Sequence, residues 1–476
     1  MPTLIARSTF GVDAATLFAW HERPGAFQRL TPPWQEVRLV SQSGGIRDGG
    51  SVVFRSRAGI IPFTWHAAHR GFIPGRQFID EQRKGPFATW VHTHEISPGV
   101  MSNTSVLTDT VQFTLPMHSL AWRFAGAGLK RDLERLFAFR HARVKADLAM
   151  HADLAAWQGT PRWLRVGVSG ATGAIGSALC GVLTTAGHDS VRLVRRKPGP
   201  GEILWQPGAG PKGGQMSPDA LNGLDAMVHL AGEPVATGRW TKRKRERIRS
   251  SRVEGTRLIA NTIAASPKPP RVLIVASGVG LYGDRGEQEL TEAAGVGSGF
   301  LAEVSRDWEA AAEPARAAGV RVVNLRIGVA LARRSGLLKA LYPWFRLGMG
   351  CVPGEGQAWW PWVDMDDVVG ATLFAIANDS VSGPINVVAP GIVRSAEFAR
   401  VLASTLDRSL LAKIPAGLLQ AVLGDKAEAL LVSCRAMPEK LRKAGYRFAA
   451  PDLAMSLKRQ LGIVTPEEAG VTIEWA

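Results

Sequence analysis

The sequence contains few cysteines and lacks both a long apolar run and a low-complexity tract. Cys180, Cys351 and Cys434 are odd in number and far apart, which argues against a disulfide framework and against a metal knuckle. No apolar run reaches the roughly 18–20 uncharged residues that a membrane span requires. The first residues also lack the apolar core of a secretory signal. These absences predict a cytoplasmic protein without a membrane span.

Positive charge is in excess, with 57 Lys and Arg against 41 Asp and Glu and a formal net charge of +16. The densest basic run, residues 242–249, predicts the polar face of a helix. No helix-turn-helix, zinc finger or base-stacking platform accompanies it. We therefore interpret the run as a solvated face or as an approach for an anionic cofactor, and we predict no nucleic-acid partner.

The first third of the chain is rich in strand patterns. Short β-branched or aromatic runs alternate with Gly, Pro, Asn and Ser clusters, which is typical of an antiparallel meander. Two short helices are expected before these strands, and a long helix after them, because apolar residues recur there at helical spacing. A sheet that grips one long helix would bury the apolar faces of both. The expected strands are 36–41, 51–57, 63–70, 76–82, 89–96 and 104–115, the short helices are 14–21 and 26–30, and the helical repeat comprises Leu129, Leu133, Phe137, Val144 and Leu148.

This order of elements resembles the helix-grip fold of the START-like, polyketide-cyclase-like superfamily, over residues 1–154. Residues 30–34 (LTPPW) are similar to the same stretch in such domains fused to epimerase-like enzymes. The resemblance implies an α+β domain that holds an apolar ligand between sheet and helix; a packed core without a ligand is the alternative. His92 and His94 alternate onto one strand face and could hold a metal. No third ligand is recognisable from the spacing, so no metal is predicted.

Residues 155–162 contain Gly159 and Pro161, which end the helix and predict a domain boundary. Beyond it, buried strands alternate with helices, which is typical of an α/β doubly wound parallel sheet. The first of these strands runs into a glycine-rich loop, residues 169–176 (SGATGAIG), that opens a helix. This context is the one that a dinucleotide site requires, and it predicts a Rossmann domain over residues 163–390.

The three glycines of this loop have distinct expected roles. Gly170 permits the tight turn, Gly173 lets backbone N–H groups approach the pyrophosphate, and Gly176 lets the helix pack closely on the strand. The positive end of the helix dipole then faces the phosphates. With Thr172 and Ile175, these glycines are the predicted cofactor-binding residues of the loop.

The choice between NADP and NAD depends on the end of the second strand, which lies beside the adenine ribose. NAD enzymes typically place Asp or Glu there to hold the free 2′-hydroxyl. This chain has Arg195 and Arg196, which suit a 2′-phosphate; exposed arginines without a ligand are the alternative. The sequence therefore predicts NADP as the cofactor, with NAD less favoured.

Several further motifs are similar to one poorly characterised subgroup of extended short-chain dehydrogenases/reductases. With the Gly-x-x-Gly-x-x-Gly spacing, they resemble the NAD(P)-dependent epimerase/dehydratase-like family, some members of which carry an N-terminal START-like domain. The resemblance covers about residues 163–460. It implies a C-terminal cap on the substrate side, over residues 391–476, and cofactor contacts from Leu230, Ala231, Gly232 and Glu233. The motifs are 225–234 (DAMVHLAGEP), 238–241 (GRWT), 281–286 (LYGDRG), 359–364 (WWPWVD) and parts of 423–448.

The catalytic residues depart from the pattern of the wider superfamily. Its enzymes use a Ser or Thr, a Tyr as acid/base, and a Lys four residues later that lowers the pKa of the Tyr. Ser277 stands where the Ser is expected, whereas Leu301 and Ser305 stand in place of the Tyr and the Lys. Tyr282 is the nearest alternative acid/base, and an aromatic there could equally serve only to pack against the nicotinamide.

Three functions remain open at this point. The leading hypothesis is an NADP-binding oxidoreductase or epimerase that acts on a small, apolar molecule of unknown identity. The alternatives are a non-catalytic NADP-binding redox sensor or interaction module, and a carrier that binds an apolar ligand in its START-like domain. The resemblance also implies a homodimer, which is common among relatives of this kind.

Overall fold

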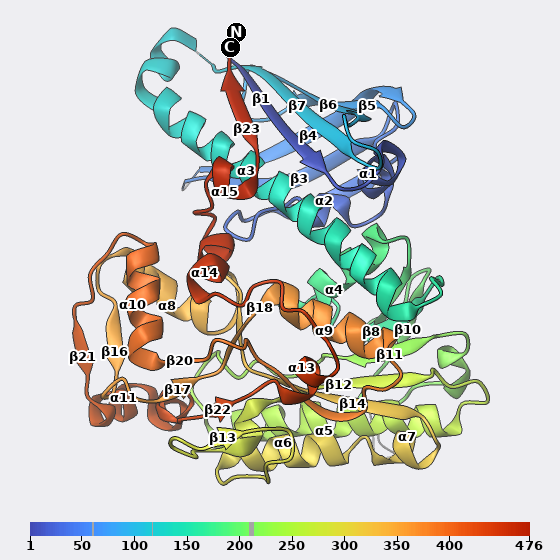
Figure 1. Ribbon diagram of the computed structural model, residues 1–476, viewed down its shortest axis with the longest axis vertical. Coiled ribbons are helices and arrows are strands. Elements are labelled where there is room, and N and C mark those ends of the chain that lie inside the picture. The colour runs from blue at the N-terminus through green and yellow to red at the C-terminus, as the bar shows by residue number, and fades with distance from the viewer. Residues whose placement is uncertain (60, 117, 209–213) are drawn as a thin grey trace. The chain divides into compact units, whose positions relative to one another are not determined.

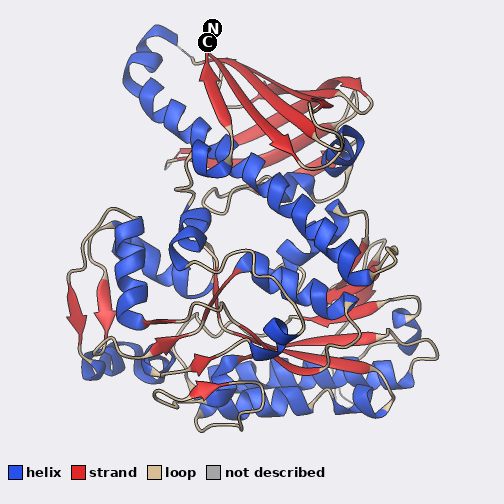
Figure 2. Cartoon of the chain, in the orientation of Figure 1, coloured by secondary structure: helices blue, strands red, loops and turns tan. Residues whose placement is uncertain are grey.

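Two units of different architecture make up the chain. The computed structural model describes residues 1–59, 61–116, 118–208 and 214–476. The first unit comprises Met1–Asp153, Gly181–Gly187 and Leu461–Ala476, and the second comprises Leu154–Cys180 and His188–Gln460. Among the described residues, none of the helices combines the length and apolarity that crossing a bilayer requires. Figure 2 shows that the first unit is rich in strands and that the second alternates strands with helices.

The first unit contains an eight-stranded antiparallel sheet in the order β2-β3-β4-β5-β6-β7-β1-β23. The long helix α3 follows the strands and packs on this sheet (Figure 1). The predicted strands, short helices and long helix are all confirmed. Their bounds are β1 (Thr3–Phe10), α1 (Ala14–Glu22), α2 (Ala26–Arg29), β2 (Arg38–Ser43), β3 (Ser51–Ala58), β4 (Ile61–Ile73), β5 (Gln77–Lys84), β6 (Thr89–Pro98), β7 (Ser105–Thr114), α3 (His118–Gln158), α15 (Pro466–Ala469) and β23 (Thr472–Trp475).

The strand β23 joins the far end of the sequence to its beginning. It pairs antiparallel with β1, and Thr3 and Ala476 exchange two backbone hydrogen bonds of 2.9 Å each. The family resemblance implies one C-terminal cap over residues 391–476, whereas Leu461–Ala476 group with the first unit. The physical reason is that β23 provides hydrogen-bond partners for the backbone groups on the free edge of β1. Val471 also adds to the apolar cluster beneath the sheet.

The buried face of this sheet has two apolar clusters with a polar row between them. On β6, Trp90 belongs to one cluster and Ile96 to the other, and the histidines 92 and 94 lie between them. The same order recurs on β7, where Asp109 separates Val111 from Leu107. The row crosses the sheet under α3, which contributes His141; its other members, on the strands, are Ser8, Asp80, His92, His94 and Asp109.

The second unit contains a seven-stranded parallel sheet in the order β10-β9-β8-β11-β12-β14-β19, which confirms the predicted doubly wound fold. Helices α5, α6 and α7 cover one face, and α4 and α9 lie on the other (Figure 1). The bounds are β8 (Arg165–Ser169), α4 (Ala174–Thr185), β9 (Asp189–Val194), β10 (Glu202–Leu204), β11 (Ala226–His229), α5 (Lys242–Ala265), β12 (Val272–Gly278), α6 (Phe300–Ala310), α7 (Glu313–Ala317), β14 (Arg321–Ile327), α9 (Met365–Ala377) and β19 (Gly383–Val387).

Smaller elements complete the second unit. Four two-stranded sheets pair β13 with β22, β15 with β18, β16 with β21 and β17 with β20. The bounds are β13 (Glu289–Leu290), β15 (Val329–Leu331), α8 (Gly336–Arg346), β16 (Cys351–Pro353), β17 (Trp359–Trp360), β18 (Trp362–Asp364), β20 (Val393–Arg394), α10 (Ser395–Thr405), β21 (Ala412–Ile414), α11 (Ala416–Leu423), α12 (Glu428–Leu431), β22 (Arg435–Ala436), α13 (Glu439–Lys443) and α14 (Leu453–Leu461).

Candidate nucleotide-binding and catalytic site

The turn between β8 and α4 needs glycine at two positions for reasons of packing. Gly170 has a φ of 70°, and a Cβ there would lie 2.8 Å from the amide nitrogen of Ala231. A Cβ on Gly176 would lie 2.2 Å from the carbonyl oxygen of Gly170. Any side chain at either position would therefore push α4 or the loop after β11 away from the turn.

Gly173 is different, because the protein itself leaves room beside it. Its amide donates to the carbonyl of Gly170 at 2.9 Å, and a Cβ there would meet only that oxygen, at 3.2 Å. Gly173 and Thr172 are exposed at the N-terminus of α4, and Ile175 is half-buried. The first amides of a helix have no intrahelical partner and carry the positive end of its dipole. This open helix end can bind a phosphate group.

The end of β9 places an exposed arginine beside this turn. Arg195 is exposed and makes no ion pair with any residue that the structure describes. Arg196 instead pairs with Glu202 at 2.7 Å and donates to the carbonyl of Lys197. The two arginines that the sequence singled out are therefore not equivalent, and Arg195 is the one available to a ligand.

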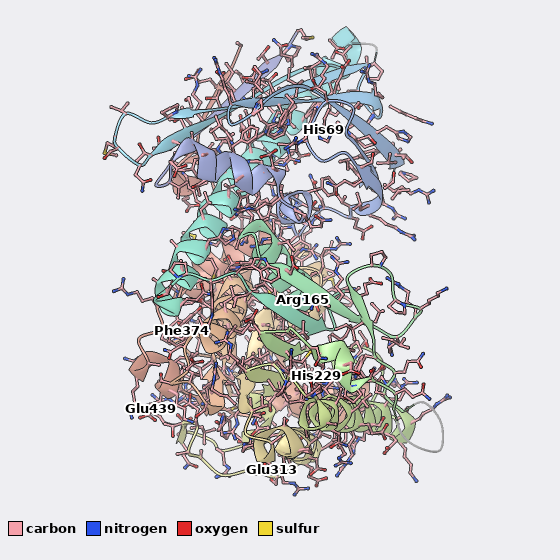
Figure 3. The ribbon with its side chains drawn as sticks, turned by 90° about the vertical axis from the view of Figure 1, so that its right-hand side faces the viewer. His69, Arg165, His229, Glu313, Phe374 and Glu439 are labelled. Carbon is pink, nitrogen blue, oxygen red and sulfur yellow. The ribbon has the colours of Figure 1, made fainter. Side chains whose placement is uncertain are left out.

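The loop that follows β11 is held against the turn by Ser169. The Ser169 hydroxyl oxygen accepts the amides of Leu230 at 3.2 Å and Ala231 at 3.4 Å, and it lies 2.6 Å from Nδ1 of His229. Figure 3 labels His229. Burial, together with the nearby charge of Arg252, lowers the pKa of His229 to about 3, so this imidazole is neutral at physiological pH. Its contribution is to fix the loop.

Glu233, at the end of this loop, is fixed by α5. Its carboxylate accepts from Lys244 at 2.6 Å, and its amide donates to Ser251 at 2.9 Å. The guanidinium of Arg252 donates to the carbonyl oxygen of Glu233 at 3.0 Å, and Gly232 leaves room for it. Glu233 therefore supplies its backbone, more than its carboxylate, to the surface of the loop.

The basic run on α5 is largely neutralised by carboxylates. Lys244 and Arg247 both approach Glu233, the latter at 3.6 Å. Further ion pairs join Arg245 to Asp425 and Arg249 to Asp307. The prediction that this segment is helical is confirmed, and the pairing explains how such a dense run of like charge is tolerated.

Ser277, the candidate catalytic serine, lies at the end of β12 in a buried polar network. Its hydroxyl donates to Glu309 Oε1 at 2.8 Å. Arg326 on β14 binds the same carboxylate through two hydrogen bonds of 2.9 Å each. A bidentate guanidinium–carboxylate pair of this kind is a strong charge-assisted contact with fixed geometry. The network therefore holds the side chain of Ser277 in one orientation.

Tyr282, the alternative acid/base, belongs to the same network but is fully buried. Its hydroxyl donates to Asn386 Oδ1 at 2.7 Å and accepts from Arg326 Nη1 at 2.9 Å. Burial raises the pKa of Tyr282 above its ordinary value of 10. A buried hydroxyl that already donates one hydrogen bond and accepts another, and whose pKa is raised, is poorly suited to proton transfer at neutral pH.

Comparisons with known proteins identify the second unit. A family model described as the NAD dependent epimerase/dehydratase family matches residues 166–389. The epimerase family protein MT2273 of Mycobacterium tuberculosis is 37% identical over 285 residues, which cover 60% of this chain and 93% of that protein. The chain belongs to the NAD-dependent epimerase/dehydratase family. A second model, a domain of unknown function named DUF1731, matches residues 414–460.

Two further proteins are similar to this chain in sequence and in structure. The human epimerase family protein SDR39U1 is 35% identical over 301 residues, which cover 62% of this chain and 99% of that protein. Its crystal structure with NADPH has a TM-score of 0.55. The crystal structure of a nucleoside-diphosphate sugar epimerase from Corynebacterium glutamicum is 32% identical, with a TM-score of 0.79, and covers 96% of this chain and 90% of that one. This last likeness extends over both units.

Within the epimerase/dehydratase fold, α6 provides no proton-transfer group at the two expected positions. Leu301 packs against Gly280, where an added Cβ would lie 3.2 Å from the Cβ of the leucine. Ser305 is buried on the same helix. The chain instead places Glu309 of α6 next to Ser277. The sequence pattern did not single out Glu309, Arg326 and Asn386; the available signal was an arginine and an asparagine inside mainly apolar, buried strands.

Proposed function

We propose that this protein binds NADPH at the turn between β8 and α4 and uses it in an oxidoreductase or epimerase reaction on a small molecule. The observation that carries the proposal is the open N-terminus of α4 next to the exposed Arg195. The helix end suits the pyrophosphate, and the guanidinium suits a 2′-phosphate. The human relative crystallised with NADPH supports the same choice of cofactor.

The cofactor preference can be tested at the end of β9. We expect Arg195→Ala to weaken NADPH binding roughly tenfold and to leave NADH binding unchanged, because one charge-assisted contact worth about 1.5 kcal/mol is lost. Arg196→Ala should have a smaller effect, since Arg196 is already paired with Glu202. Titration followed by nicotinamide fluorescence measures both affinities.

Arg192→Ala is the matched control, because Arg192 is exposed on the same strand but lies three residues before Arg195. It should leave the ratio of the two affinities unchanged. An unchanged ratio in Arg195→Ala/Arg196→Ala would show that the 2′-phosphate is held elsewhere or that the protein does not select NADP.

For catalysis, we propose that Ser277 contacts the substrate and that Tyr282 holds the loop in which it lies. The second role follows from the burial of Tyr282 and from the hydrogen bonds that its hydroxyl makes to Asn386 and Arg326. Ser277, in contrast, keeps an oxygen lone pair that can accept a hydrogen bond while its proton is donated to Glu309.

These two roles predict different effects of mutation. A panel of carbonyl compounds and nucleotide sugars is first screened for a substrate that the protein converts. With that substrate, Ser277→Ala should lower kcat by about 100-fold, as loss of one positioned polar group typically does. The affinity for NADPH should not change. Tyr282→Phe should instead destabilise the second unit by about 1–3 kcal/mol, because it removes the hydrogen bonds that the buried hydroxyl makes with Oδ1 of Asn386 and Nη1 of Arg326. A larger loss of kcat in Tyr282→Phe than in Ser277→Ala would reverse the assignment.

We also propose that the first unit is a START-like domain. The order of its elements, the antiparallel sheet and the long α3 support this proposal. No observation favours a redox sensor or a simple carrier of an apolar ligand. The polar row between the two apolar clusters of the sheet further indicates that an apolar ligand alone does not account for this unit.

A further inference from the structure

The polar row of the first unit brings acids and histidines together on three neighbouring strands. Asp80 on β5 lies opposite His92 on β6, and Asp109 on β7 lies opposite His94 on β6. The histidines are 2% and 5% exposed, and Asp109 is 3% exposed. Burying charged groups is costly unless they are paired or bind a metal. A row of this kind therefore needs a physical explanation.

Three donor atoms of the row face one another at distances that suit a metal ion. Oδ2 of Asp80 lies 3.3 Å from Nε2 of His94 and 3.9 Å from Nδ1 of His92. A donor atom from each residue lies within 4.8 Å of a donor atom from each of the other two. A tetrahedral ion with ligands at about 2.0–2.2 Å separates those ligands by roughly 3.4 Å. The triangle therefore has the size of a three-ligand metal site.

The opposite ring nitrogens of both histidines face a second carboxylate. Oδ1 of Asp109 lies 2.6 Å from Nδ1 of His94 and 3.3 Å from Nε2 of His92. Its other oxygen lies 2.9 Å from Nε2 of His141, whose Nδ1 lies 2.9 Å from the hydroxyl of Ser8. Histidines that bind metal usually direct their second nitrogen to a carboxylate, which fixes the tautomer and the ring orientation. Asp109 provides this arrangement for both imidazoles at once.

The outer carboxylate also has a partner of its own. Nε2 of His69 lies 2.7 Å from Oδ1 of Asp80 (Figure 3 labels His69). Despite these short distances, four buried atoms of the row form no well-directed hydrogen bond among the described residues; they are Oδ1 of Asp80, Nε2 of His92, Nδ1 of His94 and Oδ1 of Asp109. The side chains of the row are close together, yet they do not satisfy one another completely.

We propose that Asp80, His92 and His94 bind a divalent transition-metal ion in the first unit, with Asp109 as the positioning residue for both imidazoles. Two imidazoles and one carboxylate are ligands that suit Zn²⁺ and Fe²⁺. Three protein ligands leave a coordination position for water or for an oxygen atom of a ligand. The side chain of Asp80 is 28% exposed, so the ion can enter from that side.

The test uses the full-length protein after chelation and desalting. Calorimetric titration with Zn²⁺ should show one ion bound per chain, and Zn²⁺ should raise the temperature at which the first unit unfolds. Asp80→Asn and His92→Gln should each weaken binding by about 100-fold or more, and Asp109→Asn by about 10–100-fold. His66→Gln is the matched control, because His66 lies on the same sheet, on β4, outside the row; it should bind as the wild type does.

Cobalt provides a second readout that does not depend on activity. Binding of Co²⁺ to the wild type should produce ligand-field absorption bands in the visible region, and these should be lost in His92→Gln. Circular dichroism and NADPH binding show that each variant is folded. The proposal is overturned if the folded wild type binds neither ion at a saturable site, or if Asp80→Asn/His92→Gln retains the wild-type stoichiometry and affinity.

Discussion

Gly173→Val is expected to weaken NADPH binding by at least about 100-fold while the second unit remains folded. The side chain would occupy the open side of the turn, where the structure places only the carbonyl of Gly170, at 3.2 Å from a Cβ. It would keep the phosphates away from the first amides of α4. Loss of two charge-assisted hydrogen bonds of about 1.5 kcal/mol each corresponds to a hundredfold loss of affinity.

Gly417→Val is the control for this substitution, because Gly417 is exposed on α11 and a Cβ there would meet nothing within 4 Å. It should bind NADPH normally. Gly176→Val, unlike Gly173→Val, should disturb the fold itself, because its Cβ would collide with the carbonyl of Gly170. Wild-type affinity in Gly173→Val, measured by nicotinamide fluorescence, would mean that the cofactor does not use this turn.

Arg326→Met is expected to destabilise the second unit by about 3–5 kcal/mol, because it leaves the largely buried carboxylate of Glu309 without its cation. Although burial opposes the charged form of Arg326, the hydrogen bonds and the charge of Glu309 raise the pKa of this guanidinium above its ordinary value. The substitution also removes the donor to the hydroxyl of Tyr282. Urea unfolding followed by tryptophan fluorescence measures the change in the free energy of unfolding.

Two further variants provide a scale for the loss of stability expected in Arg326→Met. Lys413→Met removes an exposed ion pair with Glu355 and should cost about 1 kcal/mol or less. Arg326→Met/Glu309→Met should recover most of the stability lost in Arg326→Met, because replacing both charges removes the unpaired one. Equal effects of Arg326→Met and Lys413→Met would show that the buried network contributes little to stability.

The fold was predictable from the sequence where the hydrophobic pattern and the turn residues of one short segment indicate the same structure. The strand, glycine turn and helix from β8 to α4 are contiguous, and Gly170 and Gly176 meet steric requirements that arise within a few residues or at the adjacent loop. The antiparallel meander from β2 to β7 was predictable for the same reason, since each of these strands pairs with its neighbour in the sequence.

The polar networks were not predictable, because their members are distant in sequence and none forms a motif. The hydroxyl of Tyr282 meets an amide 104 residues later, and Ser277 meets a carboxylate 32 residues later. Asp80 was missed as a partner of His92 because it depends on the register between β5 and β6. Register follows from side-chain packing over the whole sheet and cannot be read from one strand.

The pairing of β1 with β23 also constrains how the protein is made. The whole second unit lies between these two strands in the sequence. During synthesis, the second unit can therefore fold on leaving the ribosome, while the first unit waits with the edge of β1 exposed until Thr472–Trp475 arrive. The sheet of the first unit therefore gains its last strand only after the whole second unit has been synthesised.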